Sequence, residues 1–120
     1  MGLQMAEFSD LEPNILEIAV ELQNLILGIF PNAITTSDSD NIGFGFGSVY
    51  KDLVFIISPY KEHVNLGIVK GADLEDPHNL MAGKGKVHMP VKLQRIEQVR
   101  SPELKELLLR ALQAAQNRIQ

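Results

Sequence analysis

The chain has 120 residues, of which 45% are hydrophobic, and carries a formal net charge of −4 at pH 7. Its size and apolar content predict a single domain over residues 1–120, and its negative charge argues against nonspecific nucleic-acid binding. The absence of cysteine excludes disulfides, thiolate zinc ligands and thiol nucleophiles.

Neither a membrane span nor a leader is visible in the sequence. No run approaches the roughly 18 consecutive apolar residues that a membrane span requires. Met1 to Ala6 lack the basic start and the apolar stretch of a secretory signal. We therefore expect a cytoplasmic protein with no membrane partner, whose residues 1–8 form a frayed N-terminus.

The first predicted element is a helix from about Asp10 to Phe30. Ser9 and Glu12 have the spacing of a capping box, and Pro31 ends the helical pattern. These signals at both ends predict a helix of about five to six turns at 3.6 residues per turn.

One face of this helix is apolar at three- and four-residue steps. The residues on it are Ile15, Ile18, Ala19, Leu22, Leu25, Ile26 and Ile29. Leu16, Val20 and Leu27 widen the apolar face beyond what one sheet contact needs. We expect the last helix or a second subunit to cover the additional width, since exposed apolar stripes rarely persist on monomers.

The segment from Thr35 to Asn41 is polar and is predicted to be a loop. Ile42 to Tyr50 then alternates with the period of a strand, which places Phe44 and Phe46 on one face. The glycines on the other face are Gly43, Gly45 and Gly47. This bare strip of backbone permits close approach by a helix or a ligand, and close packing is the favoured interpretation because the motif lacks the lysine of a phosphate loop.

Three further strands are predicted. Leu53 to Ser58 is an apolar run that follows a short polar link, which indicates a hairpin with a central second strand. Residues 63–68 alternate, as do residues 87–93, with apolar side chains directed inward. Pro90 cannot donate to a β-ladder, so the last strand is expected at an edge or at a bulge.

The final predicted element is a helix opened by Ser101 and Pro102. Its apolar face contains Leu104, Leu107, Leu108, Ala111, Leu112 and Ala115. The order of elements predicts an α+β fold, in which the first and last helices pack on one face of an antiparallel sheet of about four to five strands.

Several segments occur in an order that is specific as a whole, although each is weak alone. They are Ser58-Pro-Tyr-Lys-Glu-His-Val-Asn-Leu-Gly67, Gly71-Ala-Asp-Leu, Asp76-Pro77, Gly83-Lys-Gly-Lys86 and Val91-Lys92-Leu93. In these segments the chain resembles the YdhG-like family of domains of unknown function, from the first helix to the last. The resemblance implies a helix-sheet-helix domain, and some family members are described as frataxin-like intracellular iron chaperones.

The chain departs from this family at one pair of residues. Met89-Pro90 stands where related members often carry an Arg-His pair just before the Val-Lys step. A shared ligand site that uses that pair is altered or lost in this chain.

A basic, hydrogen-bonding face is the preferred candidate site, because a glycine-rich turn can direct backbone N–H groups and lysine ammonium groups at an anion. Its candidate residues are Lys61, His63, Asn65, Gly83, Lys84, Gly85, Lys86, His88 and Lys92. The simpler alternative is a glycine-rich turn with solvated lysines, since the spacing fits neither phosphate-binding fingerprint.

An acidic first helix offers the alternative of metal handling. Residues 1–50 contain seven acids and no Lys or Arg, and Asp10, Glu17 and Glu21 are the weak candidate ligands for ferrous or other divalent ions. The frataxin-like members that the resemblance brings in also use an acidic first helix. A solvated helix face is the simpler explanation, and the three histidines have no metal-site spacing, so no cofactor is expected, with iron as the low-probability alternative.

Three functions therefore stand at this point. The first is a non-catalytic binding module for a small anionic ligand or an acidic partner segment, and the second is iron handling. The third is a homodimeric accessory domain with Leu16, Val20 and Leu27 in its interface. No catalytic triad or other nucleophile arrangement follows from the sequence, so an enzyme is the least supported class.

Overall fold

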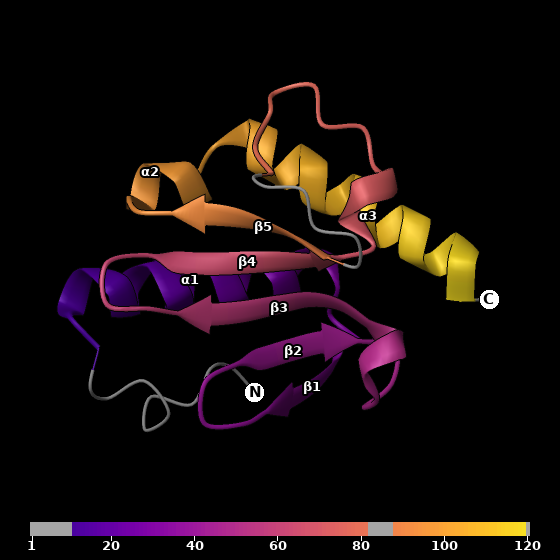
Figure 1. Ribbon diagram of the computed structural model, residues 1–120, viewed down its shortest axis with the longest axis horizontal. Helices are drawn as coiled ribbons and strands as arrows, with labels where there is room; N and C mark the ends of the chain where they lie inside the picture. Colours follow the sequence, from indigo (N-terminus) through magenta and orange to yellow (C-terminus); the bar gives the residue numbers. More distant parts are fainter. Residues whose placement is uncertain (1–10, 82–87, 120) are drawn as a thin grey trace.

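The computed structural model describes residues 11–81 and 88–119 (Figure 1). The helices and strands are α1 Pro13–Ile29, β1 Ile34–Ser37, β2 Ile42–Gly45, β3 Leu53–Pro59, β4 Val64–Val69, β5 His88–Leu93, α2 Ile96–Val99 and α3 Pro102–Ile119. Two short 3-10 turns, η2 Tyr50–Asp52 and η3 Gly71–Asp73, lie in the connections. No described helix is long and apolar enough to cross a membrane.

The predicted α+β class is confirmed. The five strands form one antiparallel sheet in the order β1-β2-β3-β4-β5, so each strand pairs with its neighbours in the sequence. In Figure 1, α1 passes behind β3 and β4, and both α1 and α3 contribute to the core that covers this side of the sheet. The predicted frayed segment, residues 1–8, lies outside the described residues.

Helix α1 begins at Pro13, three residues later than predicted. Proline at the first helical position loses no intrahelical hydrogen bond, because the first N–H groups of a helix have no partner within it. Glu12 is the N-cap residue and its side chain makes no capping hydrogen bond. The predicted capping box therefore does not form with Glu12 in its N3 position, and Ser9 lies outside the described residues. The helix ends where the Phe30 N–H donates to the Ile26 carbonyl, 2.8 Å away.

The polar segment predicted as a loop contains a strand. Residues 34–37 form β1, which pairs with β2 from Ile34 opposite Gly45 to Ser37 opposite Ile42. Periodicity does not reveal this strand because it lies at the sheet edge and buries no side chain: Ile34 is 46% exposed. Strand β2 is correspondingly shorter than predicted and ends at Gly45, where its register against β3 shifts.

The core fills the space between the sheet and the two long helices. Phe44 and Phe55 are fully buried and lie opposite each other on β2 and β3. All six apolar residues predicted for the last helix are buried, as are five of the seven predicted for the first, while Leu25 and Ile29 pack partly buried against the core. Ser101 caps α3 by accepting a hydrogen bond from the Leu104 N–H at 3.2 Å. The predicted edge position of Pro90 is confirmed, because β5 ends the sheet.

Gly45 provides a test of how closely β2 approaches the turn before β3. A Cβ atom added at Gly45 would lie 2.3 Å from the backbone oxygen of Asp52, which has no flexible end to move away. We expect Gly45→Ala to lower the free energy of unfolding by about 3 kcal/mol, measured from the urea midpoint at unchanged slope.

Gly28→Ala is the matched control, because a Cβ at this helical position meets nothing within 4 Å. It should raise stability by about 0.5–1 kcal/mol through helix propensity. Equal stability of Gly45→Ala and the wild type would contradict the close approach.

Candidate functional site

The sheet face that points away from α1 and α3 carries little side-chain volume in its middle. One row of residues in register crosses all five strands on this face: Thr36, Gly43, Ile56, Gly67 and Pro90. Two of the five are glycines, and no described helix packs over them. The second face of the sheet is therefore the place where a ligand can approach the backbone.

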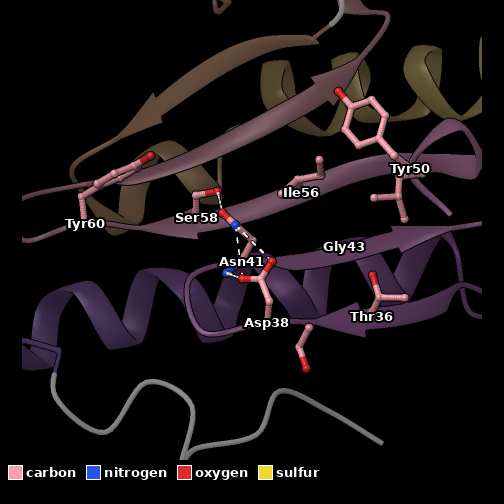
Figure 2. A pocket seen from close by; sticks show the side chains of 10 residues that line it. Thr36, Asp38, Asn41, Gly43, Tyr50, Ile56, Ser58 and Tyr60 are labelled. Carbon is pink, nitrogen blue, oxygen red and sulfur yellow. Dashed lines mark hydrogen bonds between the residues drawn. The ribbon is translucent and has the colours of Figure 1, made fainter. Parts of the chain in front are cut away.

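A hollow of about 450 Å³ lies on this face over β1, β2 and β3 (Figure 2). Its lining residues are Thr36, Ser37, Asp38, Asn41, Gly43, Tyr50, Leu53, Ile56, Ser58 and Tyr60. Figure 2 shows Tyr50 and Tyr60 at opposite ends of the hollow, and these residues are 47% and 49% exposed. The volume falls within the range of pockets for small ligands.

Gly43 lies at the floor of the hollow. A larger residue at this position would require its neighbours to move. A Cβ atom at this position would lie 2.9 Å from the Thr36 hydroxyl and 3.0 Å from a methyl carbon of Leu53. The favoured interpretation of the glycine strip as a site of close packing is supported here, and also at Gly47, whose Cβ would lie against the Asp52 carboxylate. The strip is thus part of a packed strand and turn, unlike a phosphate-binding loop.

Asp38 organises the turn at the rim of the hollow. Its Oδ1 atom accepts hydrogen bonds from the backbone N–H groups of Asp40 at 2.8 Å and of Asn41 at 2.9 Å. These two bonds hold the pKa of the Asp38 carboxyl below its ordinary value of 3.8, and the bond from Asp40 has the larger effect. Asp38 therefore stays ionised throughout the neutral range and is the only charged residue in the lining.

Beside the hollow, a polar row continues across the same face. The Ser58 hydroxyl donates to the Asn41 side-chain oxygen at 2.5 Å. Ser58 lies opposite Asn65 on β4, and Asn65 lies opposite Lys92 on β5. Lys92 is exposed, and among the residues that the structure describes no carboxylate lies within ion-pair distance of it.

The structure brings together part of the predicted basic face. Asn65 and Lys92 are cross-strand partners, and the His63 ring stacks on Tyr60 with ring centroids 4.9 Å apart. Lys61 lies exposed in the turn between β3 and β4, next to Tyr60. These four residues therefore gather at the end of the uncovered face where Ser58 and Tyr60 border the hollow.

The other predicted members of the basic face are not shown to join this group. His88 lies opposite Val69 at the far end of β5, about 13 Å along the strand from Lys92 at 3.3 Å per residue. The predicted turn of Gly83, Lys84, Gly85 and Lys86 lies outside the described residues.

The acidic residues proposed for metal binding are dispersed where they are described. Glu21 pairs with Arg100 through two hydrogen bonds of 2.5 and 3.0 Å, and that guanidinium lowers the pKa of Glu21. Glu17 is exposed, and Asp10 lies outside the described residues. Within residues 11–81 and 88–119 no three His, Asp or Glu side chains are grouped closely enough to hold a metal ion.

The residues proposed for a homodimer interface are partly buried. Leu16 and Leu27 pack against the core, and Val20 has intermediate exposure. Helix α2 and the Arg100 side chain cover a neighbouring part of α1 through the pair with Glu21. The cover on this part of α1 thus comes from the short helix α2, which the sequence does not predict, and dimerisation stays a prediction.

None of the residues predicted for the basic face lines the hollow, and the sequence interpretation considered only Gly43 of the lining as a place where a ligand could approach. Ser58 occupies an outward position of a strand that is otherwise apolar, which is a signal that periodicity provides. The Asp-Ser-Asp-Asn run from Asp38 to Asn41 has the composition of a side-chain-capped turn. The tyrosines carry no such signal, because their positions relative to the hollow depend on the turns that follow β2 and β3.

Comparisons of the chain with protein-family models, with curated protein sequences and with solved structures found no match. The resemblance to the YdhG-like family and its frataxin-like members therefore stays a prediction. The candidate site is therefore defined by the positions of the described residues alone.

The turn held by Asp38 should respond to acid. Because the pKa of Asp38 is lower in the folded chain than its ordinary value, the ionised carboxylate contributes stability above that ordinary value and loses it as the pH falls through the folded pKa. We expect hydrogen exchange at the Asp40 and Asn41 amides to accelerate at acidic pH, beyond its intrinsic pH dependence. The matched control Asp40→Asn should leave this acceleration unchanged, and Asp38→Asn should abolish it; an unchanged acid response in Asp38→Asn would refute the role of the carboxylate.

Proposed function

We propose that the chain is a non-catalytic binding module that holds a small anionic ligand on the uncovered face of its sheet. The observation that carries this proposal is the hollow of about 450 Å³ floored by Gly43, which adjoins a hydrogen-bonding row that ends in Lys92. One region receives the apolar body of the ligand and the other receives its charge.

The basic end supports binding of the anionic group. The Lys92 ammonium provides charge-assisted hydrogen bonds, and the Asn65 amide beside it provides neutral donors. Lys61 and His63 lie near the same end of the face. Since Lys92 has no carboxylate partner among the described residues, binding an anion there breaks no existing ion pair.

The hollow supports binding of an apolar body. Its floor is glycine backbone flanked by Leu53 and Ile56, and the rings of Tyr50 and Tyr60 border its two ends. Removing roughly 100 Å² of apolar ligand surface from water here is worth about 2.5 kcal/mol at 25 cal/mol per Å². An aromatic or branched aliphatic group is of the right size for this space.

The arrangement of the hydroxyl groups supports the non-catalytic part of the proposal. Ser58 donates its proton to the Asn41 amide oxygen, which is not a base, so this contact does not activate the hydroxyl as a nucleophile. The Asp38 oxygen with the closest contacts already accepts two backbone amides. These groups are arranged to orient a molecule by hydrogen bonds.

Thermal unfolding against a panel of carboxylate and phosphorylated compounds tests the proposal. A ligand that binds only the folded chain raises stability by about 2.7 kcal/mol at a hundredfold excess over its Kd. We expect an anion with an apolar body to raise the melting temperature of the wild type. Ile56→Trp, which fills the hollow with a larger side chain, should abolish the shift, and Lys92→Gln should reduce it.

Leu109→Trp is the matched control, because Leu109 is 47% exposed on α3 and lies outside the hollow. It should preserve the full shift. The unfolding transition of each variant without ligand shows whether it folds. A shift that persists unchanged in a folded Ile56→Trp variant would place the ligand elsewhere and overturn the proposal.

A further inference from the structure

A single row of polar side chains crosses the uncovered face from a carboxylate to an ammonium group. Asp38 contacts Asn41, Asn41 accepts from Ser58, and Ser58 leads through Asn65 to Lys92. The three residues between the charged ends are neutral, and each can donate and accept hydrogen bonds. The row is thus negative at the β1–β2 turn, positive on β5 and neutral between them.

The length of this row defines the separation of the charges that it can recognise. From Asp38, whose backbone pairs with Asn41 in the turn before β2, to Lys92 on β5 there are four strand spacings, or about 19 Å at roughly 4.8 Å each. The Lys92 side chain is long and exposed, so its ammonium group can reach back over the sheet. A ligand that contacts both ends needs opposite charges about 14–19 Å apart, the shorter separation applying when the lysine side chain reaches toward the turn.

Asp38 retains capacity for a positive group. Its Oδ1 atom accepts two close backbone hydrogen bonds, whereas the contact to Oδ2 is a 3.5 Å approach by the Asn41 amide nitrogen. Among the residues that the structure describes, no Lys, Arg or His lies within ion-pair distance of this carboxylate. An ammonium group at Oδ2 would therefore bind without displacing the bonds that hold the turn.

We infer that the ligand is dipolar, with an ammonium group at Asp38 and a carboxylate at Lys92, and that it belongs to the class of short unblocked peptides. This inference deepens the proposed function and rests on it. An extended chain spans about 3.4 Å per residue, so a peptide of four to five residues separates its terminal charges by about 14–17 Å. Its peptide groups would lie over Ser58 and Asn65, and an apolar side chain would enter the hollow beside Ile56.

Three versions of one peptide separate the two ends of the row. The probes are the pentapeptide alanine-alanine-phenylalanine-alanine-alanine with free termini, its N-acetylated form and its C-terminal amide. We expect the free peptide to bind the wild type, measured by calorimetric titration, and each blocked form to bind about tenfold more weakly, because each loses one charge pair. Chemical-shift changes on binding should include the Asn41 and Asn65 amides.

Two conservative variants assign each loss to its residue. In Asp38→Asn, whose side-chain oxygen can still accept the two turn amides, the free and N-acetylated peptides should bind equally. In Lys92→Gln, the free and amidated peptides should bind equally. Gln113→Glu on α3, where the exposed side chain faces Asn117 four residues along the helix, is the control for a general effect of net charge and should preserve all three affinity ratios.

The outcomes distinguish this inference from the proposed function. Equal binding of the free and N-acetylated peptides to the wild type, with weaker binding of the amide, would overturn the ammonium site and leave the anion site standing. Binding that is insensitive to both modifications would overturn the ammonium site at Asp38 and the anion site at Lys92. Absence of binding by all three peptides would overturn the peptide class, while the anion panel with Ile56→Trp decides the proposed function independently.

Discussion

Side chains alternate between the two faces along each strand, and both long helices pack on the same face. This constraint determines where everything else in the molecule lies. Residues such as Phe44, Ile57 and Leu66 are fully or almost fully buried because they face α1 and α3. Their neighbours in the sequence must then point to the other side, where no described helix covers them. The core and the candidate site are thus the two faces of the same strands, and a one-residue slip of register would exchange them.

The register shift between β2 and β3 interrupts the alternation of side chains between the two faces and contributes to the hollow. Gly45 pairs with Leu53 although Phe44 pairs with Phe55, so β3 contains one extra residue, Val54, at this point. Val54 and Phe55 are consecutive and both join the core. Leu53 consequently lies on the uncovered face, with its methyl groups beside Gly43. The bulge supplies the apolar wall of the hollow, while the glycine leaves space in front of it.

The sequence predicts those parts of the fold that periodicity encodes. Both long helices and the inward residues of β4 follow from spacing, because burial repeats at 3.6 or two residues. The edge position of Pro90 follows from its missing backbone N–H. Strand β1 does not follow, since an edge strand that buries no side chain has no apolar period. Helix α2 is a single turn of four residues and offers too few positions for a pattern to emerge.

The candidate site is less predictable than the fold for a related reason. Asn65 and Lys92 are recognisable as outward residues of two strands, but their direct pairing depends on the register between β4 and β5. Asp38 and Ser58 are 20 residues apart and meet only because Asn41 bridges them in the folded hairpin. Local composition indicates that such residues are polar and exposed. Which of them share a row is decided by strand order and register, which are tertiary properties.

Register also explains the consequence of Met89-Pro90, the pair at which the chain departs from the predicted family pattern. Position 89 faces the core, where Met89 packs partly buried, whereas position 90 faces outward in the row that contains Gly67. A histidine at position 90 would add a hydrogen-bonding ring to the uncovered face, two residues from Lys92. Proline adds no donor there, and it removes one backbone N–H from β5, which has no second neighbour among the described strands. In this chain the charge within the row therefore comes from Lys92, with Asn65 beside it as a neutral donor.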